Sequence, residues 1–165
     1  MTDNETRASR TILCPVDFSE SSITTLQQIV TDFSHDIELN LLHVLEVGPG
    51  TGEHPHERPD VQFAMYLETL NQAGCQYRLF IESGSPAETI ISFAGNLQPD
   101  FITIGSHGMT NLKCLVMGST AEALLRYAPF PVLLYKAHPK GRAPFCSSNH
   151  EHRPARERMA TMYWF

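Results

Sequence analysis

The alternation of short apolar runs with helical segments constrains the fold of this chain more than any other feature. Five runs of six or seven residues predict buried strands: TILCPV (11–16), LNLLHVL (39–45), QYRLFIE (76–82), DFITIG (100–105) and PVLLYK (131–136). Most of them are nearly continuous in hydrophobicity, which is typical of strands in a parallel sheet that is covered on both faces.

Between these runs, apolar residues recur at spacings of three and four, the period of an amphipathic helix. Ser85-Pro86-Ala87-Glu88 predicts a helix start, with a cap residue, a proline in the first turn and an acidic residue three positions after the cap. Ser119-Thr120-Ala121-Glu122 has the same cap spacing. The order β-α-β-α-β-α-β-α-β, with right-handed crossovers, predicts an α/β fold: a doubly wound open sheet with helices on both faces.

The chain divides into a body and two terminal segments. Residues 9–137 contain every periodic segment and form one predicted domain, whereas residues 1–8 and 138–165 are expected to be a flexible N-terminus and a flexible C-terminal extension. The extension ends in an apolar cluster, which we interpret as a frayed end, with docking on the body or on a partner as the alternative. This cluster consists of Met159, Met162, Tyr163, Trp164 and Phe165.

Composition narrows the class of protein. The formal net charge is −6, no stretch approaches the roughly 18 apolar residues of a membrane span, and the polar first ten residues lack the apolar core of a secretion signal. The four cysteines form no C-x-x-C pair, and no four-ligand spacing of a structural zinc site occurs. We therefore expect a cytoplasmic protein without bound structural metal, and without nucleic-acid or membrane partners.

Doubly wound sheets bind ligands beyond the carboxyl ends of their strands, where the strand order reverses. After the fourth run the chain reads GSHGMTNLKCLVMGST (105–120), with the spacing G-x2-G-x9-G-S. Glycines permit positive φ and close approach of a phosphate, and a helix start at Gly118-Ser119 favours an anion. The spacing is neither a Walker A loop nor a G-x-G-x-x-G fingerprint. The residues alone leave phosphate binding and ordinary turn chemistry equally open.

Several phrases of the sequence resemble the universal stress protein family over about residues 9–137. They are TILCPVDFSESS, LLHVLE, ESGSPAETII and GSHGMTNLKCLVMGSTAEALLRYAPFPVLLYK. The resemblance implies five parallel strands in the order 3-2-1-4-5. It also implies ATP as the ligand, accompanied by Mg²⁺, because the complete G-x2-G-x9-G-S spacing is typical of the ATP-binding branch of that family.

The resemblance also implies which residues of this sequence contact each part of the nucleotide. Contacts to the ribose and phosphates fall to residues of the glycine-containing segment, namely Gly105, Gly108, Gly118, Ser119 and Thr120. Ser119 could instead serve only as a helix cap.

The nucleoside end is assigned to the ends of the first, second and fourth strands. Pro15 and Asp17 would border the nucleoside, with Asp17 accepting a ribose hydroxyl or ordering a hydrated Mg²⁺. Val44 and Ile104 would pack on adenine. The alternatives are that Asp17 only caps the first helix and that Val44 and Ile104 are plain core.

Three functions remain open at this stage. We favour an ATP-binding regulatory protein of the stress response that acts by conformational or partner signalling. The alternatives are a dimeric interaction module that needs no nucleotide and a slow ATP-hydrolysing enzyme. No H-R-D loop or arginine finger motif is present, so at most weak ATPase activity is expected. The resemblance implies a homodimer through the last strand, PVLLYK, expected at a sheet edge; the sequence names no protein partner.

Overall fold

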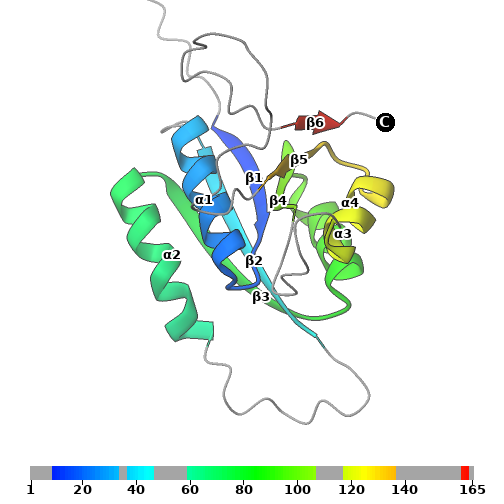
Figure 1. The fold of residues 1–165 in the computed structure, drawn as a ribbon, viewed down its shortest axis with the longest axis horizontal. Helices are drawn as coiled ribbons and strands as arrows, with labels where there is room; N and C mark the ends of the chain where they lie inside the picture. The colour runs from blue at the N-terminus through cyan, green and yellow to red at the C-terminus, as the bar shows by residue number, and fades with distance from the viewer. Residues whose placement is uncertain (1–8, 34–36, 47–58, 107–116, 137–160, 164–165) are drawn as a thin grey trace, which may run out of the picture.

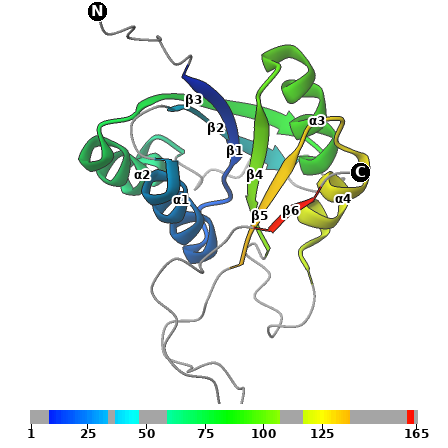
Figure 2. The same cartoon turned by 90° about the horizontal axis from the view of Figure 1, so that it is seen from above.

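The computed structural model describes residues 9–33, 37–46, 59–106, 117–136 and 161–163. One sheet separates two pairs of helices (Figures 1 and 2). Its strands are β1 (Arg10–Pro15), β2 (Ile37–Glu46), β3 (Gln76–Gly84), β4 (Phe101–Gly105), β5 (Val132–Tyr135) and β6 (Thr161–Tyr163). The helices α1 (Glu20–Phe33) and α2 (Pro59–Ala73) lie on one face, and α3 (Pro86–Leu97) and α4 (Ser119–Tyr127) lie on the other.

The strand order in the sheet is β3-β2-β1-β4-β5-β6. The first five strands of this order are parallel, so the predicted α/β fold and the order 3-2-1-4-5 are confirmed. The sequence did not predict β6, which pairs antiparallel with β5 through Leu133 and Met162. The expectation that the last strand of the body forms a sheet edge is therefore wrong for the described residues. Of the predicted flexible extension, the structure describes only residues 161–163.

Side chains of β1 alternate between two cores because successive residues of a strand point to opposite faces. Ile12 and Cys14 pack with Leu26 of α1 on one face. Leu13 packs with Ile90 of α3 on the other. All five side chains are almost completely buried, as the near-continuous hydrophobicity of the first run predicts.

β3 departs from the sequence expectation of a buried strand. Six of its nine residues are exposed, in the burial pattern eieeieeei. The physical reason is its position at the edge of the sheet, where it has β2 as its one neighbour among the described strands. The hydrophobicity of QYRLFIE reports strand propensity here rather than burial.

The order of the strands reverses between β1 and β4: β2 and β3 follow on one side of β1, and β4 and β5 follow on the other. β1 pairs with β2 at six positions but with β4 at only two, Ile12 with Phe101 and Leu13 with Ile102. Beyond Leu13 the β1–β4 ladder ends, which opens the switch point of the fold. Pro15 still pairs with Leu42 of β2 but has no partner in β4, so its missing N–H group costs no ladder hydrogen bond on the β4 side.

Candidate functional site

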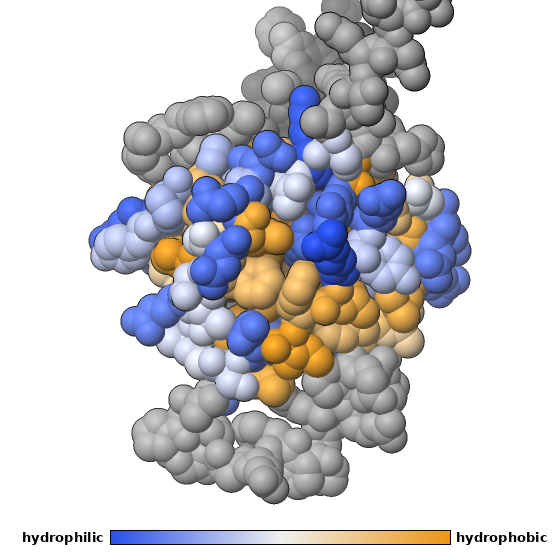
Figure 3. Space-filling view, turned by 180° about the vertical axis from the view of Figure 1, so that it is seen from behind, coloured by the Kyte–Doolittle hydropathy of each residue, from blue (hydrophilic) through white to orange (hydrophobic). Residues whose placement is uncertain are grey.

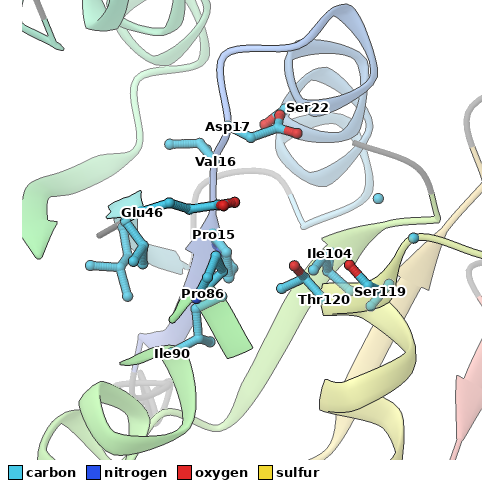
Figure 4. Close-up of a pocket in the computed structure, with 15 residues that line it drawn as sticks. Pro15, Val16, Asp17, Ser22, Glu46, Pro86, Ile90, Ile104, Ser119 and Thr120 are labelled. Carbon is cyan, nitrogen blue, oxygen red and sulfur yellow. The ribbon is translucent and has the colours of Figure 1, made fainter. Parts of the chain in front are cut away.

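A pocket of about 220 Å³ lies at this switch point, at the carboxyl ends of the parallel strands. Figure 4 shows side chains from the end of β1, the start of α3 and the start of α4 converging on it. Eight of the nine predicted site residues line this one pocket, namely Pro15, Asp17, Val44, Ile104, Gly105, Gly118, Ser119 and Thr120. The ninth, Gly108, lies outside the described residues.

Asp17 lies between the pocket and the start of α1. Its Oδ1 accepts hydrogen bonds from the N–H of Ser19 at 3.0 Å and from the Oγ–H of Ser19 at 2.6 Å. Ser19 Oγ in turn accepts the N–H of Ser22 at 3.1 Å, which makes Ser19 the cap of α1. Asp17 thus orders the helix start and also lines the pocket.

Backbone and side-chain bonds hold the chain just before Asp17. The N–H of Val16 donates to the carbonyl of Leu42 at 2.9 Å. The carbonyl of Val16 accepts Nδ1–H of His43, also at 2.9 Å. His43 is buried and its ring lies 4.2 Å from that of Phe18, centroid to centroid. These contacts fix the tip of β1 beside the pocket, which Val16 and Leu42 also line.

The amino end of α4 lies at the pocket, where the sequence predicts an anion-binding element. Gly118 is the cap residue of α4, with Ser119 as the first helical residue, so the expectation that Ser119 is the cap is wrong. The N–H of Gly118 donates to the carbonyl of Ser106 at 3.0 Å, which ties the helix start to the end of β4. The first N–H groups of a helix have no acceptor within it, and the helix dipole adds partial positive charge.

The two motif glycines that the structure describes, Gly105 and Gly118, do not have the positive φ expected of them. Gly118 has φ −63° and ψ 143°, which any residue adopts, and the described glycines with positive φ are Gly74 and Gly84. What Gly118 contributes is therefore space, since a side chain at this position would stand at the pocket wall.

An apolar wall faces the start of α4 across the pocket. Val44 and Ile104 line the pocket and also belong to the core between the sheet and α3. Their packing on adenine stays a prediction. Pro86 and Ile90 of α3 complete the wall. The sequence marked Pro86 only as a helix-start residue, although its place after a strand end was a usable signal.

Glu46 is a pocket residue that the sequence analysis missed. It is the last residue of β2 and exposed, and Figure 4 shows its carboxylate on the same side of the pocket as Asp17. The rule that directed attention to strand ends would have found it. The pocket therefore carries two carboxylates at one end and helix N–H groups at the other. Among the described residues, no cluster of three His, Cys, Asp or Glu residues could hold a metal ion.

Cys14, immediately before Pro15, does not add a nucleophile to this site. It is fully buried, and burial raises the pKa of its thiol to about 11. A thiol with this pKa is protonated near neutral pH, and the thiolate is the reactive form. Cys14 is therefore a core residue, as its apolar run predicts.

The fold and the pocket define an α/β protein with a pocket at the switch point of a parallel sheet. The chain belongs to the universal stress protein family, which matches residues 8–136. Universal stress protein MJ0531 of Methanocaldococcus jannaschii is 26% identical over 137 residues, 76% of this chain and 81% of that protein.

Solved structures agree with this family membership. The structure of hypothetical protein MJ0577, also from Methanocaldococcus jannaschii, matches with a TM-score of 0.67 and 28% identity. The match covers 80% of this chain and 99% of that one. A universal stress protein family protein from Arabidopsis thaliana, solved with AMP bound, matches with a TM-score of 0.60 and 17% identity, over 82% of this chain and 97% of that one. At that identity the likeness shows the fold alone. Among the described residues, no helix is both long and apolar enough to cross a membrane.

Proposed function

We propose that this protein binds ATP together with Mg²⁺ in the switch-point pocket and acts in a stress response through nucleotide-dependent conformational or partner signalling. The observation that carries the proposal is the convergence of eight predicted site residues, from four separate strand or helix ends, on one pocket. AMP bound to a relative of the same fold supports a nucleotide as the ligand class.

The chemistry of the pocket fits the parts of the nucleotide. Val44, Ile104 and Pro86 offer an apolar surface for the base. The amino end of α4 at Ser119 and Thr120 offers N–H groups for phosphate oxygens. The volume of about 220 Å³ is below the roughly 300–1,000 Å³ of pockets that bury most of a ligand. We therefore expect a bound nucleotide to keep part of its surface exposed.

The two carboxylates account for the Mg²⁺ in this proposal. Asp17 and Glu46 would repel a bare triphosphate, since like charges at short range disfavour each other. A hydrated Mg²⁺ bound to the phosphates removes this repulsion, because Mg²⁺ retains waters that donate hydrogen bonds to carboxylates. In this proposal the metal arrives with the nucleotide.

The test uses Gly118→Asp, because this change should move stability and ligand affinity in opposite directions. Asp is favoured at a helix cap, and φ −63°, ψ 143° accommodates it, so the free energy of unfolding should be unchanged or higher. Its carboxylate would occupy the anion-binding end of α4, so the affinity for ATP–Mg²⁺ should fall more than about tenfold, or 1.4 kcal/mol.

Isothermal titration calorimetry with ATP–Mg²⁺, together with urea denaturation, measures both quantities. Gly118→Ser serves as the matched control, because Ser also caps the helix but adds no charge, and it should lose less affinity than Gly118→Asp. Equal ATP affinity for the unchanged protein and Gly118→Asp, or no heat with either, would refute the proposal.

A further inference from the structure

β3 presents a long open strand at the surface. It pairs with β2 over nine positions, from Gln76 to Gly84, and no described strand lies on its other side. Its outer row of N–H and C=O groups is therefore available to a further strand. The opposite side of the sheet differs, because β6 already pairs there with β5.

The side chains of this edge include an apolar patch. Four large hydrophobic side chains are exposed among the described residues, and two of them, Leu79 (37% exposed) and Ile81 (47% exposed), lie two positions apart on the same face of β3. Figure 3 views the molecule from this side and shows hydrophobic surface at its centre, interrupted by hydrophilic residues. Singly scattered apolar residues need no explanation, whereas neighbours on an unpaired strand indicate an interaction surface.

The sequence of β3 is complementary to itself in one antiparallel register. If two copies pair with Phe80 opposite Phe80, then Leu79 faces Ile81 of the second copy and Arg78 faces Glu82 of the second copy. The Leu79–Ile81 pair joins two apolar side chains, and the Arg78–Glu82 pair joins opposite charges. Each pair forms twice in the dimer because of its two-fold symmetry.

Neighbouring registers lack this complementarity. Centring the pair on Leu79 places Arg78 opposite Phe80, and an in-register parallel pair places Arg78 against its own copy. Edge strands usually carry charges that prevent pairing. Here the two charges lie symmetrically about Phe80 and are opposite in sign, so they favour one register instead.

Existing contacts hold the side chains in place for this pairing. The guanidinium of Arg78 contacts the carboxylate of Glu38 at 3.0 Å while the side chain stays 63% exposed. Arg has five N–H donors, so a second carboxylate can bind without breaking this pair. The ring of Phe80 packs against Phe93 of α3, with centroids 4.8 Å apart. Both side chains are thus positioned before a second copy arrives.

We propose that two copies of this chain associate through antiparallel pairing of their β3 strands, centred on Phe80. The product is a continuous sheet that runs through both copies. This dimer differs from the one that the family resemblance implies, which would join the copies at β5. It depends on β3 alone and does not require a bound nucleotide.

The experiment reverses the two charges one at a time and together. Sedimentation velocity over a concentration series should show that R78E and E82R each raise the dimer dissociation constant about tenfold, because each creates two like-charge contacts. The double variant R78E/E82R should regain most of the original affinity. An equimolar mixture of R78E and E82R should form a heterodimer that is tighter than either homodimer.

Two controls separate this interface from other effects. E82R leaves the Arg78–Glu38 pair intact, so its loss of dimer cannot come from that contact. K136E changes an exposed charge directly after β5, and the β3 dimer should not respond to it. A protein that stays monomeric at all concentrations, a dimer weakened by K136E but not by E82R, or a double variant as weak as the single ones would overturn the proposal.

Discussion

Asp17 owes its position to residues that do not line the pocket. Phe18 has φ +61°, a left-handed conformation that is rare for an aromatic residue and costs on the order of 1 kcal/mol or more. The ring contact with His43 and the edge contact with Phe63, whose centroid is 5.1 Å away, offset this cost. The turn at Phe18 then directs the chain into α1 and leaves the Asp17 side chain at the pocket. The carboxylate is thereby held in place before any ligand binds.

Asp17→Asn tests the role of the charge while keeping the local structure. Asn retains an Oδ1 that accepts the Ser19 N–H, so the free energy of unfolding should change by less than about 1 kcal/mol. Affinity for ATP in the presence of Mg²⁺ should fall several-fold, whereas affinity in EDTA should rise or stay the same, because one repulsive charge is removed. Calorimetric titration gives the ratio of the ATP affinity with Mg²⁺ to the ATP affinity without Mg²⁺ for each protein. If this ratio were the same in both proteins, Asp17 would have no part in ordering the metal.

At the scale of elements, Gly84 at the end of β3 and Gly95 inside α3 differ in the space that a side chain would have. Gly84, just before the Ser85 cap position of this helix, has φ +147°, and a Cβ there would lie 2.6 Å from Oγ1 of Thr89. Gly95, inside the helix, has open space where its Cβ would be. Although Ser85 is the cap residue as predicted, its side chain makes no capping hydrogen bond. The glycine turn, rather than the serine hydroxyl, therefore sets the start of α3.

Alanine substitutions at these two positions should have opposite effects on stability. Gly84→Ala should lower the free energy of unfolding by about 1–3 kcal/mol, because it combines backbone strain with a steric clash. Gly95→Ala should raise it by about 0.5–1 kcal/mol, since alanine loses less conformational entropy in a helix. Urea denaturation of both variants measures the difference. A neutral or stabilising Gly84→Ala would contradict this account of the helix start.

The sequence predicts elements best where the signal is local. The five parallel strands and four helices follow from apolar periodicity, and eight of the pocket residues follow from motif spacing and family resemblance. β6 was missed because three residues paired with β5 leave no periodic pattern of their own. The exposure of β3 was missed because burial depends on which strands become neighbours. Glu46 was missed because the resemblance assigns no role to it, although it ends the phrase LLHVLE and the strand β2.

At the scale of the whole molecule, a buried thiol and two phenol groups make the free energy of unfolding depend on pH in the alkaline range. Burial raises the pKa of the Cys14 thiol from 9.0 to about 11, and it also raises the pKa of the phenols of Tyr66 and Tyr135. In the unfolded chain these groups ionise at lower pH than in the folded protein. The unfolded state therefore loses its protons first, and the contribution of Cys14 is complete below pH 9.0 and is lost as the pH rises towards about 11.

Cys14→Ala isolates this part of the pH dependence. The free energy of unfolding of the unchanged protein should fall by up to about 3 kcal/mol more than that of the variant between pH 9.0 and about 11, from two pKa units at 1.36 kcal/mol each. Denaturation curves of both proteins across this range give the difference. If the two free energies of unfolding differed by the same amount at every pH, ionisation of the Cys14 thiol would have no effect on stability.

The early end of the β1–β4 ladder has a mechanical consequence for the molecule. Beyond Leu13, the strands β3, β2 and β1 form one half of the sheet and β4, β5 and β6 the other. A molecule bound between Asp17 and the start of α4 would contact both halves of the sheet and restrict their motion relative to each other. Binding in the pocket would then make the sheet more rigid without changing the mean position of any atom. Slower amide hydrogen exchange at Cys14 and Thr103 would report this change.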